Sequence, residues 1–201
     1  MPINSVYQAP FECGGFYHVF NRCVDGQKLF YEGENYRFFL EKYHKYLQEL
    51  IRLYAWSLIP NHFHFFLSVR EEEEIPADLL IDLSVNELVT DRFKRFFLSY
   101  SHSLKKQQGV RTNVFTQKFR HKRITSDQQM TNLFYYVHHN PLHHGITEDW
   151  ERYRWSSYMQ IIKGRSGIVD DDYAINWFGG RDRFVRDHRL NAEKYFLEFD
   201  L

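Results

Sequence analysis

The sequence predicts an α+β protein with a ferredoxin-like split βαβ fold, in which an antiparallel sheet carries its helices on one face. Segments with strand composition alternate with segments of helical periodicity in the order β-α-β-β-α-β, which is the order of this fold. The 201 residues are 43% hydrophobic and 18% aromatic, enough for the core of one substantial domain. No internal repeat or low-complexity linker interrupts the alternation.

The first half of the predicted core contains one strand, one helix and a pair of strands. Residues 16–24 (FYHVFNRCV) are rich in aromatic and β-branched side chains and predict the first strand. Apolar residues recur at helical spacing over 35–50, which predicts an amphipathic helix. Segments 53–59 and 62–70 predict two strands, joined by a Pro-Asn pair that is typical of a tight turn.

The second half begins with a helix that has clear start and stop signals. Ser84 to Glu87 is a capping box, and the helix that it opens should end near Gly109. Residues 114–125 predict a strongly basic strand. A second capping box at 126–129 opens an added helix over 126–140, and we expect Pro141 to end it.

The chain is organised as one domain with a short extension. Glycines and acidic residues after about residue 163 predict a linker, which divides the chain into a domain at 1–163 and a C-terminal extension at 164–201. No apolar run approaches the roughly 20 residues of a membrane span, and no signal peptide precedes the first strand, so we expect no membrane partner. The two cysteines form neither a metal-like pair nor a disulfide framework, which favours a cytoplasmic location.

Charge is distributed unevenly, although the formal net charge is zero. The segment from Arg92 to Ser126 contains ten Lys and Arg residues and no acid. This asymmetry favours binding to a polyanion on one face, and a solvated basic surface is the alternative. The residues that we expect to contact nucleic-acid phosphates are Arg92, Lys94, Arg95, Lys105, Lys106, Arg111, Lys118, Arg120, Lys122 and Arg123.

Two histidines in the stretch IPNHFHFFLS are the first candidates for chemistry. Alternate residues of a strand share a face, so His62 and His64 project together, while Phe63 and Phe65 point to the opposite, helix-covered face. Two imidazoles on a rigid strand can bind one divalent cation. The alternative is two independent histidines on the open face of the sheet.

Several enzyme classes are excluded by residues that the sequence lacks. A hydrolase with a His-x-His-x-His motif would need a third histidine where Phe66 stands. A zinc deaminase would need a His-x-Glu motif followed by Cys-x-x-Cys. Neither a glycine-rich phosphate loop nor a Gly-x-Ser-x-Gly elbow is present.

The added helix supplies candidate partners for the histidines. Its segment FYYVHHNP contains two pairs at i, i+4 spacing, Tyr135 with His139 and Tyr136 with Asn140. On a helical wheel at about 100° per residue, Tyr136 and Asn140 flank the apolar stripe and can reach over the sheet, whereas the other pair faces solvent. Tyr136 and Asn140 are therefore the better candidates. A half-buried packing role is the alternative for Tyr136.

Four motifs taken together resemble a known family. HFH after Pro60-Asn61, then the basic strand, YVHHNP at 136–141 and WSSY at 155–158 stand in the order of the HUH single-strand tyrosine transposases. Over roughly residues 16–163 the chain looks most like the REP-associated tyrosine transposases, relatives of the small insertion-sequence enzymes. This resemblance implies that His62, His64 and Asn140 bind a divalent metal, Mg²⁺ or Mn²⁺, and that Tyr136 is the nucleophile.

The same resemblance implies an activity. It is that of a metal-dependent DNA nuclease and strand transferase, which cuts and rejoins single-stranded DNA near hairpins through a 5′-phosphotyrosine intermediate. The implied partner is single-stranded or hairpin DNA, and monomer and homodimer both stay open. Two alternatives also stay open: a non-cleaving DNA-binding regulator on the same fold, and a nicking enzyme of the replication-initiator or relaxase type.

Overall fold

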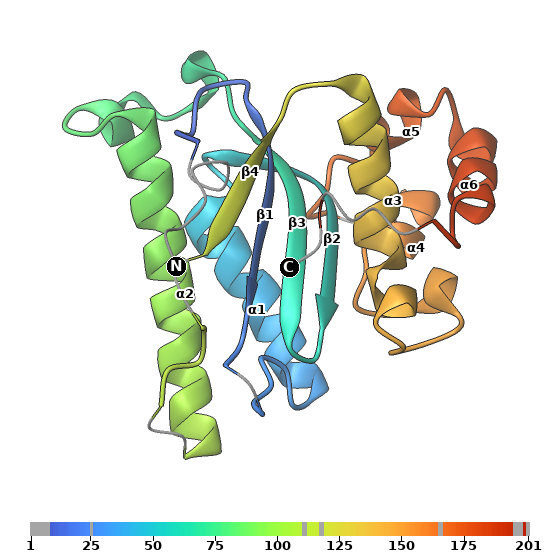
Figure 1. Ribbon diagram of the computed structural model, residues 1–201. Coiled ribbons are helices and arrows are strands. Elements are labelled where there is room, and N and C mark those ends of the chain that lie inside the picture. Colours follow the sequence, from blue (N-terminus) through green and yellow to red (C-terminus); the bar gives the residue numbers. More distant parts are fainter. Residues whose placement is uncertain are drawn as a thin grey trace.

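Four strands form one antiparallel sheet in the order β2-β3-β1-β4. A computed structural model describes residues 9–24, 26–109, 112–116, 119–164, 167–194 and 199 of the chain. The strands are β1 (Phe16–Arg22), β2 (Ile51–Ile59), β3 (His62–Val69) and β4 (Arg120–Ile124). Their order, with helices between β1 and β2 and between β3 and β4, is the predicted split βαβ fold (Figure 1).

Two helices, α1 (Gly33–Leu47) and α2 (Val85–Gln108), cover one face of the sheet. Phe63 and Phe65 of β3 point to this face and pack on Phe39 of α1, with ring centroids 5.1 and 6.0 Å apart. Phe39 also meets Phe96 of α2 at 4.7 Å. The predicted alternation of β3 is therefore confirmed for its aromatic side, which builds the main core.

The boundaries of α2 follow the predicted capping signals. The Ser84 hydroxyl accepts a hydrogen bond from the Glu87 N–H, and the Glu87 carboxylate accepts one from the Ser84 N–H. Gly109 ends the helix with a φ of 66°, a left-handed conformation that costs glycine little. Both ends of this helix are thus fixed by local chemistry that can be recognised in the sequence.

Two other predicted boundaries are wrong. Among the described residues of the strand predicted at 114–125, Arg120–Ile124 pair with β1, and Phe115 forms an isolated bridge with Cys23 instead. Pro141 does not end the added helix, because α3 runs from Asp127 to His143. A proline removes one N–H donor, and the turn continues since the carbonyl of Asn140 accepts a hydrogen bond from the N–H of His144.

The opposite face of the sheet is covered by α3 (Asp127–His143). Ser126 caps this helix by accepting a hydrogen bond from the Gln129 N–H. Phe134 packs edge-on against Phe66 of β3, with ring centroids 4.9 Å apart. The predicted apolar stripe is buried as a whole: Met130, Leu133, Phe134 and Val137. The added helix therefore gives the sheet a second helical layer.

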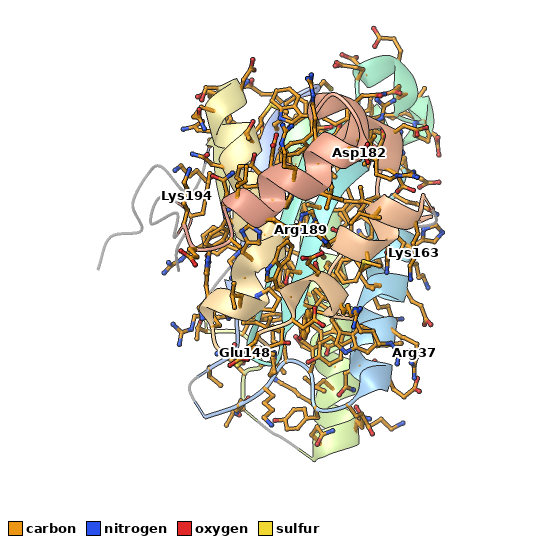
Figure 2. All side chains as sticks on the ribbon, turned by 90° about the vertical axis from the view of Figure 1, so that its right-hand side faces the viewer. Arg37, Glu148, Lys163, Asp182, Arg189 and Lys194 are labelled. Atoms are coloured by element: carbon orange, nitrogen blue, oxygen red, sulfur yellow. The ribbon has the colours of Figure 1, made fainter. Side chains whose placement is uncertain are left out.

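Three short helices, α4 (Tyr158–Lys163), α5 (Asp171–Trp177) and α6 (Arg181–Leu190), pack beside α3. Val169 bridges Leu53 at the free edge of β2, and Arg189 of α6 donates two hydrogen bonds to Glu151. Figure 2 shows Arg189 in the middle of the surface that these helices form. Of the linker predicted after about residue 163, residues 165 and 166 lie outside the described residues, whereas the acidic residues Asp171 and Asp172 begin α5. Single 3₁₀ turns cover Glu72–Glu74, Ala77–Leu80 and Trp150–Arg152.

None of the helices in the described part of the chain combines the length and the apolar character that a membrane crossing requires.

Candidate active site

His62 and His64 lie on the face of the sheet that α3 covers. Their exposed fractions are only 2% and 0%, and their rings are perpendicular with centroids 5.0 Å apart. The expectation of an open sheet face is therefore wrong. The apolar stripe of α3 requires a surface to pack against, and it takes the same face of the sheet, so the histidines lie beneath the helix.

Each of these histidines is held through its Nδ1 atom. Nδ1 of His62 lies 2.9 Å from Oδ1 of Asn61, and Nδ1 of His64 lies 2.8 Å from Nε2 of His18. The amide oxygen of Asn61 can only accept, so His62 carries its proton on Nδ1 and has a lone pair on Nε2. Within the described part of the chain, Nε2 of both His62 and His64 is buried and has no hydrogen-bond partner.

The helix α3 places Tyr136 and Asn140 above this pair. The buried ring of Tyr136 stands perpendicular to His64, with centroids 5.1 Å apart. Asn140 follows one turn later, and both polar atoms of its buried amide lack hydrogen-bond partners among the described residues. One further turn on, His144 packs 4.5 Å from the ring of His62. Tyr136 and Asn140 thus face the sheet, as the helical wheel predicts.

Burial keeps the two histidines neutral. The pKa of His62 is lowered to about 3, mainly by desolvation and also by the nearby His144, whereas the side chain of Asn140 raises it. Desolvation also holds the pKa of His64 well below its ordinary value of 6.5, with additional effects from His62 and His18. Neutral imidazole is the form that binds a metal ion, so the site has this form at neutral pH.

Tyr135 and His139 do not face solvent, contrary to the sequence-based expectation. Both are buried, and a second layer of structure covers them. The ring of Tyr135 lies 4.9 Å from His188 of α6, and that of His139 lies 4.4 Å from Trp150. The periodicity of one helix cannot reveal a packing partner that follows about fifty residues later, so this outer cover was missed.

His138, between the two faces of α3, connects the helix to the C-terminal segment. His188 donates from Nδ1 to the carbonyl of Phe184 at 2.8 Å, so its Nε2 accepts from Nδ1 of His138 at 2.9 Å. Nε2 of His138 is hydrogen-bonded to the Ser157 hydroxyl, also at 2.9 Å. The side chains of His138, His188 and Ser157 are all fully buried, so this hydrogen-bond network is structural and no substrate can reach it.

Acidification is expected to destabilise the protein through these buried histidines. Desolvation lowers the pKa of His188 to about 3 and that of His139 to about 2, against about 6.5 in an unfolded chain. Their contribution to stability is therefore complete above about pH 6.5 and is lost as the pH falls toward the folded values. At pH 5 the loss is about 2 kcal/mol for each such histidine.

Urea denaturation at about pH 7.5 and about pH 5, followed by tryptophan fluorescence, measures this loss. His188→Gln should reduce the difference between the two unfolding free energies, because it removes one proton-binding group. The exposed His102 provides the control, and His102→Gln should leave the difference unchanged. An equal pH dependence in all three proteins would contradict the assignment.

The predicted phosphate contacts on β4 divide between the two faces of the sheet. Lys122 is paired with His18 in the β1–β4 register and Arg120 with Phe20, so both lie on the face of the candidate site. Arg123 points to the other face and forms an ion pair with Glu12 at 2.5 Å. Only the first two thus share a surface with His62 and His64.

The remaining predicted contacts lie farther from the site or outside the described residues. Arg95 is already paired with Asp91 at 2.7 Å. Arg111 and Lys118 lie outside the described residues. The cations on α2, which packs on the opposite face of the sheet, are Arg92, Lys94, Arg95, Lys105 and Lys106.

Besides His144, three residues that the sequence motifs did not indicate also lie at the site. His18 bonds to His64, and the exposed Arg22 stands opposite His62 in the β1–β3 register. Phe199 is 1% exposed, and its ring lies 5.6 Å from those of both His18 and Tyr136. Pairing the first strand with the third would have placed positions 18 and 22 on this face, whereas Phe199 has no local sequence signal.

Comparison by sequence identifies no family, since neither a family model nor a curated protein matches the chain. Comparison by structure finds a solved REP-associated tyrosine transposase bound to a REP hairpin. The TM-score is 0.61 at 17% sequence identity, and the match covers 83% of this chain and 88% of that one. At this identity the match shows the fold: the chain has a tyrosine-transposase-like α+β architecture.

Proposed function

We propose that this protein is a metal-dependent, transposase-like DNA nuclease and strand transferase that cuts and rejoins single-stranded DNA near hairpins. The observation that carries this proposal is the set of side chains that meet under α3. The buried Tyr136 lies there with the Nε2 atoms of His62 and His64 and the amide of Asn140. The fold supports it, because a tyrosine transposase bound to a DNA hairpin has the same architecture.

The donor atoms of the site fit a divalent cation. His62 and His64 offer Nε2 lone pairs and Asn140 an amide oxygen, and all three atoms are buried without hydrogen-bond partners among the described residues. No three His, Cys, Asp or Glu side chains in the described part of the chain are grouped to hold a metal, so a cation at this site would need the amide of Asn140 beside the two imidazoles. Bound Mg²⁺ or Mn²⁺ would supply Lewis-acid polarisation of the scissile phosphate.

Tyr136 is the proposed nucleophile. Its phenolic oxygen forms a bond to phosphorus while the bond from phosphorus to the 3′-oxygen breaks, and the phenol loses its proton as the leaving oxygen gains one. The products are a 5′-phosphotyrosine and a free 3′-hydroxyl. Because the covalent link retains the energy of the phosphodiester, the hydroxyl of another strand can reverse the step and join new ends.

A cleavage assay tests the function as a whole. Labelled single strands that carry candidate hairpins are incubated with the protein and Mn²⁺ or Mg²⁺, then separated on a denaturing gel. We expect a shifted protein–DNA band and a shorter strand with a free 3′-hydroxyl. Hairpin binding without either product would instead support the non-cleaving regulator on the same fold.

Cations on the site face should contribute most to DNA binding. Arg120→Ala combined with Lys122→Ala should lower affinity and reduce the slope of log K against log salt by about 2, since each lost phosphate contact removes about one released counterion. Fluorescence anisotropy at several salt concentrations measures the slope. Lys94→Ala with Lys106→Ala removes two exposed cations of α2 and provides the comparison.

The comparison decides between two paths for the DNA. If the slope changes in the Arg120→Ala, Lys122→Ala variant alone, the DNA strand lies on the sheet face that carries the candidate site. An equal change in the α2 variant would mean that the DNA also follows α2, as the charge of the sequence suggests. No change in either variant would leave the basic segment as a solvated surface.

A further inference from the structure

The hydrogen bond between His18 and His64 can have either residue as its donor, whereas the hydrogen bond between Asn61 and His62 cannot. Nε2 of His18 lies 2.8 Å from Nδ1 of His64, and the two rings are nearly parallel at 19°. Both rings are fully buried, and burial favours the neutral form of an imidazole. A neutral imidazole has one N–H and one lone pair, so either of these rings can be the donor.

The two arrangements differ in what His64 presents to the site. If His64 donates from Nδ1, its Nε2 has a lone pair available for a metal. If His18 donates from Nε2, the proton of His64 must lie on Nε2, and no lone pair remains there. An amide oxygen never donates, so Asn61 permits one tautomer of His62, whereas the tautomer of His64 depends on its partner.

We propose that His18 is a positioning residue that holds His64 in its Nδ1–H tautomer and thereby directs the Nε2 lone pair into the candidate metal site. This inference rests on the proposed function, because it assigns a role within the same metal-binding set. In the described part of the chain, His18 is the partner that His64 has for Nδ1. Metal ligands of this type commonly depend on such a second hydrogen bond for their tautomer and orientation.

The packing around His18 fixes the direction in which its Nε2 atom points. One face of the ring stacks on Phe20, with centroids 4.6 Å apart, and Tyr136 meets it edge-on at 5.8 Å. The β1–β3 register places Phe20 directly opposite His64, so the strand pairing itself sets the distance between the two imidazoles. The site thus receives its third histidine from a strand that none of the ligands occupies.

Nitrogen-15 NMR of labelled histidines tests this role directly, because two-bond couplings distinguish the two tautomers of each ring. The parent protein with Mg²⁺ should show the Nδ1–H tautomer of His64. His18→Gln should keep it, since a glutamine oxygen can accept the same bond. His18→Phe removes the acceptor and should shift His64 toward the Nε2–H tautomer, with Mn²⁺ affinity in calorimetry reduced about 10- to 100-fold.

The controls separate this role from packing. His138→Gln changes another buried histidine–histidine bond, outside the site, and should leave the His64 signals and metal affinity unchanged. His62 should keep its tautomer in every variant. If His18→Phe does not fold, His18→Asn supplies the comparison, because its shorter side chain withdraws the acceptor.

The proposal is wrong if His64 keeps the Nδ1–H tautomer and the parent's Mn²⁺ affinity without an acceptor at position 18. It is equally wrong if His18→Gln and His18→Phe weaken metal binding to the same extent, because the role would then be packing. Failure of the parent to cleave DNA would instead refute the proposed function, and the tautomer of His64 would still be measured independently.

Discussion

Tyr136→Phe is expected to give a folded protein that binds DNA and forms no covalent adduct with it. Phenylalanine keeps the buried ring that packs against His64, so the substitution removes the hydroxyl alone. Without the nucleophilic oxygen, cleavage should fall by at least about 10⁴-fold. A denaturing gel of the protein with labelled strand and Mn²⁺ measures the adduct, and peptide mapping of the shifted band locates it.

The neighbouring tyrosine provides a matched control. Tyr135 is also buried, but its ring packs on His188 and Phe178, on the side of α3 away from the sheet. Desolvation raises the pKa of Tyr135 to about 12, which further disfavours its phenolate. Tyr135→Phe should therefore still form the adduct. An adduct that maps to Tyr135, or that survives Tyr136→Phe, would refute the assignment of the nucleophile.

The parts of the fold that the sequence predicts are those in which the pattern of a segment reflects its own immediate surroundings. The alternation around Phe63 and Phe65 and the caps of α2 at Ser84 and Gly109 are of this kind. The burial of His139 is different, because it depends on Trp150 and α6. Long-range cover of this sort leaves no trace in the periodicity of the covered helix.

The candidate site follows the same division. Strand period and helical spacing place His62 with His64, and Tyr136 with Asn140, each within a single element. His18 becomes visible only when β1 is paired with β3 in the correct register. The cations of the basic segment look continuous in the sequence, yet α2 packs on one face of the sheet, whereas Arg120 and Lys122 of β4 point to the other face.

His62→Ala and His64→Ala are each expected to abolish metal-dependent cleavage and to weaken Mn²⁺ binding strongly. Each substitution removes one of the two proposed imidazole ligands, whereas Asn140→Ala removes the proposed amide ligand, which is a poorer one, and should have a smaller effect. Because both histidines are buried, alanine also leaves a cavity and an unpaired partner, which should cost about 1–3 kcal/mol of unfolding free energy. Calorimetric titration with Mn²⁺ measures the binding, and urea denaturation measures the stability.

A control for burial separates these two effects. His139 is an equally buried imidazole on α3, on the side away from the sheet, so His139→Ala should lose comparable stability while keeping metal binding and adduct formation. DNA binding should survive in all of these variants below their unfolding transitions, because the cations proposed to contact phosphate are unchanged. Undiminished Mn²⁺ binding by the combined His62→Ala, His64→Ala variant would refute the proposed metal site under α3.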